Sequence, residues 1–300
     1  NDSKVCKIVE PTIISGFMEL LPREQMVFNR MLDTIRCTFE RYGFIPIDTP
    51  VIEKAEVLLA KSGGDTAKQV YRFNKGDHDL ALRFDLTVPL ARYVAQHYGD
   101  LTFPFRRYHI GKVYRGERPQ KGRFREFYQC DIDIIGSGSL SVNNDAEIVS
   151  VIYSTFKALR LGDFTIMINN RKLLNGFFDS LGIQDTLEVL RIVDKLDKIG
   201  SEAVRGELQE LGISRDAADS ILRLTSLSGN AAYIIDELKT LQIENPLYKK
   251  ELEDLESVCR YIEAYRVDPE HFTINLKIAR GLDYYTGTVY ETILNDYPSL

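Results

Sequence analysis

Residues 106–136 have the sequence RRYHIGKVYRGERPQKGRFREFYQCDIDIIG, and two parts of it alternate in the manner of β-strands. The pattern predicts strands over YHIGKVYRGE (108–117) and FYQCDIDII (127–135). Between them, RPQKGR contains the proline and glycine that are typical of a hairpin loop. We therefore predict that the fold is built on an antiparallel sheet.

The second of these strands has one polar face and one apolar face, because successive residues of a strand point to opposite sides. The residues on the polar face would be Phe127, Gln129, Asp131 and Asp133. The residues on the apolar face would be Tyr128, Cys130, Ile132 and Ile134. The apolar face is suited to a core.

Two further segments place charged residues in the same way. In the first, Arg115 and Glu117 share a face. In the second, a strand is predicted over LALRFD (80–85), where Arg83 and Asp85 share a face, and Thr87 lies on the same face if the extended geometry continues. Charges of both signs are also normal on the solvated face of an ordinary antiparallel sheet. Three strands with complementary charges nevertheless favour a functional site.

A basic segment interrupts an acidic chain. The formal net charge is −6, which argues against non-specific attraction to nucleic acid. Between Arg106 and Arg125, however, eight residues are basic and only Glu117 is acidic. This density predicts a polyphosphate site. No GxxxxGK[ST] loop occurs, so arginine side chains, whose fixed fork contacts two phosphate oxygens, would bind the phosphates.

Around this segment the sequence alternates between helical and extended patterns. A helix is predicted from Arg23 to Tyr42 after Pro22, stopped by Gly43, and FIPIDTPVIE (44–53) would be an extended edge or interface strand because of its two prolines. Further predictions are a helix over 146–159 with Asn144 as N-cap, and strands over 164–169, 272–279 and 286–294. The fold class is therefore α+β, an antiparallel sheet flanked by helices. We predict a core at 1–170 and 266–300, with a helical insertion at 171–265.

Several classes of protein are disfavoured. No apolar run reaches the roughly 18 residues of a membrane span, and NDSKVCKIVE (1–10) lacks the features of a secretory signal, so a cytoplasmic location is the default expectation. The four cysteines and four histidines show no ligand spacing, so no protein metal site is predicted.

Three segments resemble a known family when they are taken together. Residues 106–136 resemble motif 2 of class II aminoacyl-tRNA synthetases in its histidyl form, and ARGLDYYTGTVYE (279–291) resembles the histidine-binding signature of the histidyl-tRNA synthetases. YGFIPIDTPVIE (42–53) resembles motif 1, which forms a dimer interface in the family. The resemblance, from about Ser15 to Leu300, implies a homodimer that activates histidine with ATP and transfers it to tRNA(His).

The resemblance also implies roles for residues at the ATP site. Arg115 would hold the α-phosphate and the amino-acid carboxylate, and Arg280 would reach the same phosphate, so these two arginines would be catalytic. Glu117 would contact adenine, Arg123 would bind the terminal phosphate, and Phe127 would stack on the adenine ring. Mg²⁺ would bridge the β- and γ-phosphates, held mainly by ATP itself.

A second set of residues would bind histidine. By motif position, Asp85, Thr87 and Gln129 match residues that bind the α-amino group, while Asp133 and Tyr285 match residues that contact the imidazole. Tyr284, Arg115 and Arg280 complete the set implied by the resemblance. Many relatives carry glutamate at the position of Asp133, which would alter the depth of the pocket.

Other interpretations stay open at this point. The family continues into a motif 3 and an anticodon-binding domain that the 300 residues do not contain, so we expect a part of a longer protein. A synthetase-like regulatory subunit of ATP phosphoribosyltransferase, a non-catalytic histidine sensor, would lack the anticodon domain as well. The ATP-binding set favours the enzyme. A purely structural or nucleic-acid-binding module would leave the imidazole-pocket residues unexplained.

The helical insertion matches the place where the family has a helical domain that approaches the tRNA acceptor stem. Its basic residues could contact phosphates, although a solvated helical surface explains them equally well. These residues are Lys195, Lys198, Arg205, Lys249, Lys250 and Arg260.

Overall fold

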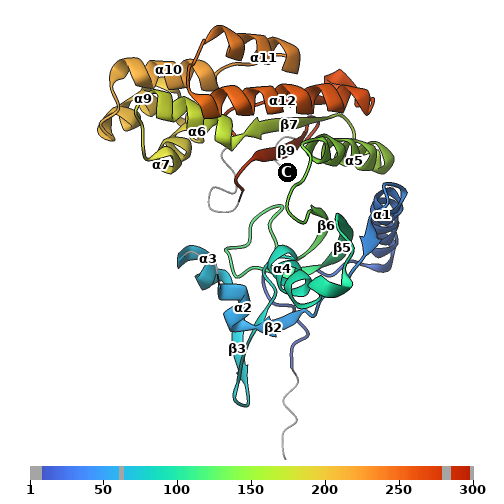
Figure 1. Ribbon diagram of the computed structural model, residues 1–300. Coiled ribbons are helices and arrows are strands. Elements are labelled where there is room, and N and C mark those ends of the chain that lie inside the picture. Colours follow the sequence, from blue (N-terminus) through green and yellow to red (C-terminus); the bar gives the residue numbers. More distant parts are fainter. Residues whose placement is uncertain (1–8, 61–63, 279–284, 298–300) are drawn as a thin grey trace, which may run out of the picture. The chain divides into compact units, whose positions relative to one another are not determined.

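The computed structural model describes residues 9–60, 64–278 and 285–297. The chain forms two compact units, Asn1–Ser139 and Leu140–Ser299 (Figure 1). The sequence predicted a different division, with domain boundaries at residues 170 and 265 instead of a boundary after residue 139. That domain division stays a prediction.

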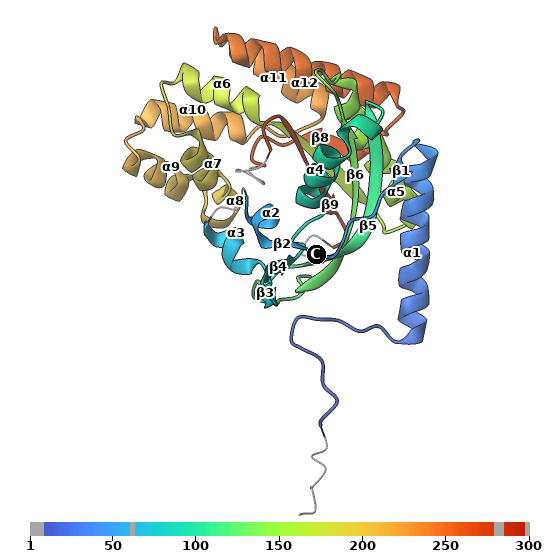
Figure 2. The same ribbon diagram turned by 60° about the horizontal axis from the view of Figure 1, so that its bottom comes forward.

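The first unit opens with a long helix, α1 (Pro22–Arg41), where the sequence predicts one. Pro22 suits the first helical position because its missing N–H has no partner there in any helix. The chain turns away at Gly43, whose φ of 77° favours glycine. Figures 1 and 2 both place α1 beside strand β5 (Phe105–Tyr114), and the rings of Phe39 and Tyr108 lie 6.0 Å apart.

Strand β5 is the centre of a three-stranded sheet, in the order β1-β5-β6. Strand β6 (Glu126–Ile135) pairs with it antiparallel over ten residue pairs, from Phe105 opposite Ile135 to Tyr114 opposite Glu126. The predicted hairpin is thus confirmed. Strand β1 (Ile45–Pro46) is parallel to β5 at the edge, the position that a strand containing proline tolerates.

A smaller antiparallel sheet in the same unit has the order β2-β4-β3. Its strands are β2 (Ile52–Lys54), β3 (Arg72–Lys75) and β4 (His78–Leu82). The helices beside it in sequence are α2 (Ala55–Leu59), α3 (Gly64–Gln69), α4 (Thr87–Gln96) and the 3₁₀ turn η1 (Tyr98–Asp100). The predicted strand over 80–85 therefore ends early, at Leu82.

The second unit has a sheet of order β8-β7-β9. Strand β7 (Phe164–Asn170) pairs parallel with β8 (Phe272–Ile274) and antiparallel with β9 (Thr288–Leu294). The prediction for 272–279 was too long, since the described strand has three residues. The alternation of β7 buries Phe164, Ile166 and Ile168, which belong to the largest hydrophobic core.

Helices make up the rest of the second unit. They are α5 (Asn143–Leu159), α6 (Arg171–Ser180), α7 (Thr186–Val193), α8 (Leu196–Ile199), α9 (Ser201–Glu210), α10 (Arg215–Thr225), α11 (Ala231–Thr240), α12 (Pro246–Ala264) and the 3₁₀ turn η2 (Pro269–His271). The N-cap predicted at Asn144 was wrong: α5 begins at Asn143, and the preceding Val142 has no side-chain cap. The α+β prediction is confirmed. No helix of the described residues is long and apolar enough to cross a membrane.

Candidate active site

One face of the β5–β6 pair carries most of the predicted polar residues of the first unit. Residues directly opposite each other in an antiparallel pair share a face. The opposed pairs on this face are Arg107 with Asp133, His109 with Asp131, Gly111 with Gln129, and Val113 with Phe127. The opposite face lies against α1, where the rings of Phe28 and Tyr128 are 5.3 Å apart. The polar face is therefore the side of the strand pair that is turned away from α1, and its residues on β5 are buried.

Arg107 and Asp133 form an ion pair at one end of this face. Arg107 is 0% exposed, and its Nη2 contacts Oδ2 of Asp133. Burial raises the pKa of Asp133, while the charge of Arg107 and its hydrogen bond act in the opposite direction. A buried guanidinium requires such a counter-charge, because an isolated ion in the interior is costly. Sequence reasoning predicted Asp133 but missed Arg107, since only the strand register pairs the two.

His109 lies next along the same face and is 1% exposed. Its Nε2 is 2.9 Å from Oδ1 of Asp48. Burial lowers the pKa of His109 to about 4, and the nearby charges of Arg83 and Arg107 act in the same direction. The imidazole is therefore neutral at pH 7.

Arg83 directly follows β4, and its side chain packs against this face at Gly111. The side chain is buried, its Nε donates to the carbonyl of Lys112 (2.7 Å) and its Nη1 donates to the carbonyl of Thr49 (2.6 Å). A Cβ on Gly111 would lie 2.5 Å from Nη2 of Arg83, so any other residue there would have to displace the buried guanidinium. A glycine inside a strand is a sequence signal that another group lies close to the backbone. Gly111 could therefore have indicated a close contact at this position.

Asp85 has a different role from the one predicted by strand alternation. Its Oδ1 accepts hydrogen bonds from the backbone N–H groups of Thr87 (3.1 Å) and Val88 (2.9 Å). These are free donors of the first turn of α4, and a carboxylate there stabilises the helix start. The extended geometry does not continue to Thr87, because Thr87 is the first residue of α4. The helix start still keeps Asp85 and Thr87 together.

Arg115 follows the end of β5, and two aromatic rings contact its guanidinium. The Cζ atom lies 4.7 Å from the ring centroid of Phe84 and 5.0 Å from that of Phe127. Its Nε also donates to the carbonyl of Phe84 (3.3 Å). Cation–π contacts of this kind restrict the orientation of the guanidinium and do not use the N–H donors of its two Nη atoms. The arginine predicted to bind phosphate is thus held in place.

Glu117 and Arg123 face each other across the loop between β5 and β6. Nη1 of Arg123 is 3.7 Å from Oε2 of Glu117, and the arginine side chain is 58% exposed. Glu117 is partly buried, whereas an ion pair made by an exposed side chain contributes little to stability, so Arg123 can exchange its partner for a ligand group at small cost. Both residues were predicted, and the loop brings them together.

Gln129 presents a buried acceptor. Its Oε1 has no hydrogen-bond partner among the described residues. A buried unpaired amide oxygen costs free energy, which a ligand donor would recover.

The remaining predicted residues lie outside this group. Arg280 and Tyr284 lie outside the described residues. Tyr285 belongs to the second unit, where its side chain is 51% exposed and its carbonyl accepts a hydrogen bond from Nη1 of Arg171. Within the first unit, the structure brings together the following predicted residues: Asp85, Thr87, Arg115, Glu117, Arg123, Phe127, Gln129 and Asp133.

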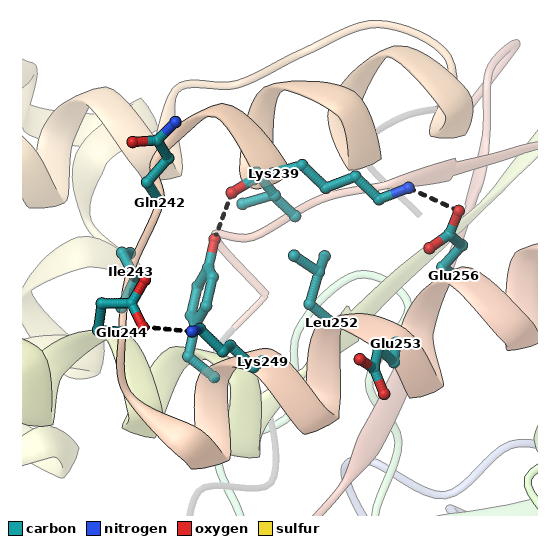
Figure 3. A pocket seen from close by; sticks show the side chains of 10 residues that line it. Lys239, Gln242, Ile243, Glu244, Lys249, Leu252, Glu253 and Glu256 are labelled. Carbon is teal, nitrogen blue, oxygen red and sulfur yellow. Dashed lines mark hydrogen bonds and ion pairs between the residues drawn. The ribbon is translucent and has the colours of Figure 1, made fainter.

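The second unit has a hollow of about 420 Å³ between α11 and α12 (Figure 3). Lys239 is 2.7 Å from Glu256, and the hydroxyl of Tyr248 donates to the carbonyl of Leu238 (2.9 Å). Lys249 pairs with Glu244. These polar groups already have partners, and the hollow contains none of the predicted site residues.

Most of the cations considered for phosphate contact in this unit are paired as well. Lys195 lies 2.7 Å from Glu207, Arg205 lies 2.6 Å from Asp219, and Lys250 lies 2.6 Å from Asp254. These pairs favour a solvated helical surface at those positions.

Comparisons with known proteins agree on one family. The model of the histidyl-tRNA synthetase family matches residues 16–299. The histidine–tRNA ligase of Clostridium tetani is 62% identical over 293 residues, which cover 98% of this chain and 67% of that protein. The histidine–tRNA ligase of Clostridium acetobutylicum is 49% identical over 286 residues, which cover 95% and 66%. The chain thus spans about two thirds of the length of the curated relatives it matches.

Solved structures give the same result. The crystal structure of histidyl-tRNA synthetase from Nostoc sp. PCC 7120 superposes with a TM-score of 0.89 at 42% identity, covering 97% of this chain and 66% of that one. An ATP phosphoribosyltransferase regulatory subunit/histidyl-tRNA synthetase from Bacillus halodurans C superposes with a TM-score of 0.82 at 24% identity, covering 95% and 74%. That identity supports the shared fold alone. From the family model, the relatives and the Nostoc structure together, the chain belongs to the histidyl-tRNA synthetase family.

Proposed function

We propose that this chain is the catalytic region of a histidine–tRNA ligase. In the first step the carboxylate of histidine attacks the α-phosphorus of ATP, giving histidyl-adenylate and pyrophosphate. In the second step a terminal ribose hydroxyl of tRNA(His) takes the histidyl group. The observation that carries this proposal is the placement of Arg115, held between Phe84 and Phe127 beside the polar face of β5 and β6.

ATP would bind along the loop between β5 and β6. Arg115 would contact the α-phosphate and the substrate carboxylate together with Arg280, and the two positive charges would stabilise the charge that develops during attack. Glu117 would contact adenine, Phe127 would stack on it, and Arg123 would bind the terminal phosphate. The pair between the exposed Arg123 and the partly buried Glu117 supports this, because the two groups lie 3.7 Å apart and the arginine can exchange its partner for a phosphate at small cost.

Mg²⁺ would enter with ATP and would supply positive charge that offsets the charge of the phosphates. The described residues contain no group of three or more histidine, cysteine or acidic side chains that could hold a metal ion by themselves.

Histidine would bind on the polar face. Asp85, Thr87 and Gln129 would receive its α-amino group, and the unpaired Oε1 of Gln129 supports this role. The imidazole would be recognised by Asp133 and Tyr285, and Tyr284 completes the histidine-binding set with the two arginines. Because a competing amino acid would leave these buried groups unpaired, the discrimination would be strong.

The reaction needs no covalent enzyme intermediate. Catalysis would rest on alignment of the carboxylate with the α-phosphorus and on preorganised positive charge. The two rings around Arg115 support this, because a guanidinium that is already oriented need not reorganise during the reaction.

Histidine-dependent exchange of pyrophosphate into ATP tests the proposal. It would be measured on the 300-residue chain and on a form extended to the length of the relatives. We expect exchange with histidine and with no other amino acid, at least in the longer form. Histidine binding without exchange in either form would contradict the proposal and favour a regulatory histidine sensor.

We also propose a cytoplasmic homodimer. The support for a dimer is a set of exposed apolar side chains in α1, β1, β2 and the adjoining segments, some of them within residues 42–53, where the sequence resembles motif 1. These are Ile14, Leu21, Met26, Val27, Ile45, Val51 and Ile52. Apolar surface of this kind is typical of protein–protein interfaces.

A further inference from the structure

Arg125 belongs to the basic segment that predicted a polyphosphate site, and the proposed function gives it no role. It directly precedes β6, at the end of the loop along which ATP would bind, and its side chain is partly buried. Its Nε donates to the carbonyl of Glu117 (3.1 Å), and its Nη1 donates to the carbonyl of Ser15 (3.2 Å). The guanidinium therefore joins this loop to a turn near the start of the chain, residues 14–17, which we call the N-terminal turn.

The backbone of Arg125 makes two further hydrogen bonds with the same two segments. Its N–H donates to the carbonyl of Gly16 (2.7 Å), and its carbonyl accepts a hydrogen bond from the N–H of Arg115 (2.9 Å). Arg115 and Glu117 are the proposed ligands of the α-phosphate and of adenine. Arg125 thus connects both of them to the N-terminal turn.

Gly16 packs directly on the side chain of Arg125. An added Cβ at this position would lie 2.9 Å from both Cγ and Cδ of Arg125 and 3.1 Å from Cβ of Pro119. The φ of Gly16 is 86°, a conformation that glycine adopts at little cost. The N-terminal turn can therefore lie against the aliphatic part of Arg125 because residue 16 has no side chain.

A separate contact holds the start of the loop from the side of α3. The N–H of Gly116 donates to the carbonyl of Gln69 (2.7 Å), the last residue of that helix. The rings of Phe17 and Tyr71 lie 6.5 Å apart, so the N-terminal turn also contacts the segment after α3. Residues 115–117 thus each have a backbone hydrogen bond that fixes them before a substrate binds. Groups ordered in advance lose less conformational entropy on binding.

We propose that Arg125 is a positioning residue of the ATP site: it holds Arg115 and Glu117 in place by joining their loop to the N-terminal turn, and it does not itself contact ATP. This inference rests on the proposed function, because it assumes that ATP binds along the loop between β5 and β6.

The first test compares Arg125→Ala and Arg125→Lys with wild type, in the form of the protein that shows pyrophosphate exchange. We expect Arg125→Ala to raise the KM for ATP about ten- to a hundredfold, the range for a hydrogen bond made by a charged group. The KM for histidine should stay within about threefold. Arg118→Ala, which removes an exposed charge from the same loop, is the control and should keep both KM values within about twofold.

Arg125→Lys separates positioning from a simple effect of charge. Lysine keeps the positive charge but lacks the fixed fork that reaches two carbonyls in different segments. We therefore expect its KM for ATP to stay at least about fivefold above that of wild type. A wild-type KM in Arg125→Lys would show that charge is sufficient and would overturn the proposal.

Gly16→Ala tests the same contact with every charged group in place. Its methyl group would displace the side chain of Arg125, so we expect the KM for ATP to rise at least about threefold. The matched control is Gly76→Ala in the turn between β3 and β4, where φ is also positive but nothing lies within 4 Å of the added Cβ. In the Arg125→Ala background, Gly16→Ala should add no more than about twofold, because the displaced side chain is gone. Equal effects in the two backgrounds would contradict the coupling.

Hydrogen exchange of backbone amides measures the position of the loop without a substrate. We expect the N–H groups of Arg115 and Gly116 to exchange about tenfold faster in Arg125→Ala than in wild type, because the loop opens more often. Amides of α12, in the second unit, should exchange equally fast in both. A higher KM for ATP with unchanged exchange would place Arg125 on the nucleotide itself. A lower melting temperature with an unchanged KM for ATP would leave it a structural role alone, and either result would overturn the proposal.

Calorimetric titration of ATP distinguishes failure of this inference from failure of the proposed function. If wild type binds ATP without histidine-dependent exchange, the ligase activity is contradicted, and weaker or equal binding by Arg125→Ala then supports or overturns the positioning role. If wild type exchanges pyrophosphate and Arg125→Ala binds ATP equally well, the role of Arg125 alone is overturned. Absence of ATP binding by wild type would overturn both.

Discussion

At the scale of single residues, Arg115 has the clearest chemical assignment. Its guanidinium is oriented by Phe84 and Phe127, so its charge and its fork geometry are both fixed before a substrate binds. A lysine would keep the charge but could not hold two oxygens in the same way.

We expect Arg115→Lys to lower the rate of pyrophosphate exchange about a hundredfold and Arg115→Ala about a thousandfold, since removing one group that stabilises developing charge has effects of this size. Arg118→Ala, at an exposed arginine of the same loop, is the matched control and should retain the wild-type rate. Equal activity of Arg115→Ala and the control would remove Arg115 from the mechanism.

His109 gives a prediction about pH. Its pKa in the folded protein is about 4, below the ordinary value near 6.5, so between these values the unfolded chain binds a proton that the folded chain does not. Stability from this residue is therefore fully present above pH 6.5 and is lost as the pH falls toward 4. We expect the urea midpoint of His109→Gln to depend less on pH between 7.5 and 4.5 than that of wild type. Parallel pH dependence in both proteins would show that the pKa of His109 is the same in the folded and the unfolded protein.

Several of these residues could not have been assigned from the sequence. Alternation along β6 predicted that Gln129, Asp131 and Asp133 share a face. It could not predict Arg107 as the partner of Asp133, because that pairing depends on the register between two strands, which an eleven-residue loop leaves open. The hydrogen bonds from the first turn of α4 to Asp85 were not predicted, because the polar alternation of 80–85 resembles that of a longer strand.

At the scale of elements, helix α6 packs very closely on α12. An added Cβ at Gly176 would lie 2.5 Å from the backbone N of Tyr248. Backbone atoms cannot move aside as a flexible side chain can, so the glycine sets the distance between the two helices.

We expect Gly176→Ala to lower the free energy of unfolding of the second unit by about 1–3 kcal/mol, the usual cost of overpacking. Gly206→Ala in α9 is the matched control, because nothing lies within 4 Å of the added Cβ. This control should be neutral or stabilising by up to about 1 kcal/mol, since alanine favours the helix. Urea unfolding of both variants measures the difference, and equal stabilities would mean that the helices can separate.

Long, strongly periodic elements were predicted more accurately than the short ones, of which β3 was not predicted and β8 was predicted too long. The helix α1 and the strands β5, β6, β7 and β9 follow the hydrophobic pattern closely. The short strands β3 and β8 gain their pairing from neighbours in space, and a local pattern does not contain that information.

At the scale of the whole molecule, the proposed homodimer makes a prediction about association. We expect Met26→Asp and Val27→Asp to shift the protein toward monomer in sedimentation velocity, because a charge within an apolar interface is costly to bury. Leu211→Asp, at an exposed leucine of the second unit, is the control and should sediment as wild type. Dimers of unchanged strength in the α1 variants would place the interface elsewhere.

The pairing of β7 with β9 has a consequence for synthesis on the ribosome. Their residues are separated by about 120 positions, and translation proceeds at about 5–20 residues per second, so β7 waits roughly 6–24 seconds for its partner. During that interval its apolar side must be covered by the helices that are made in between. The nascent second unit is therefore expected to need protection from aggregation until Thr288–Leu294 has left the exit tunnel.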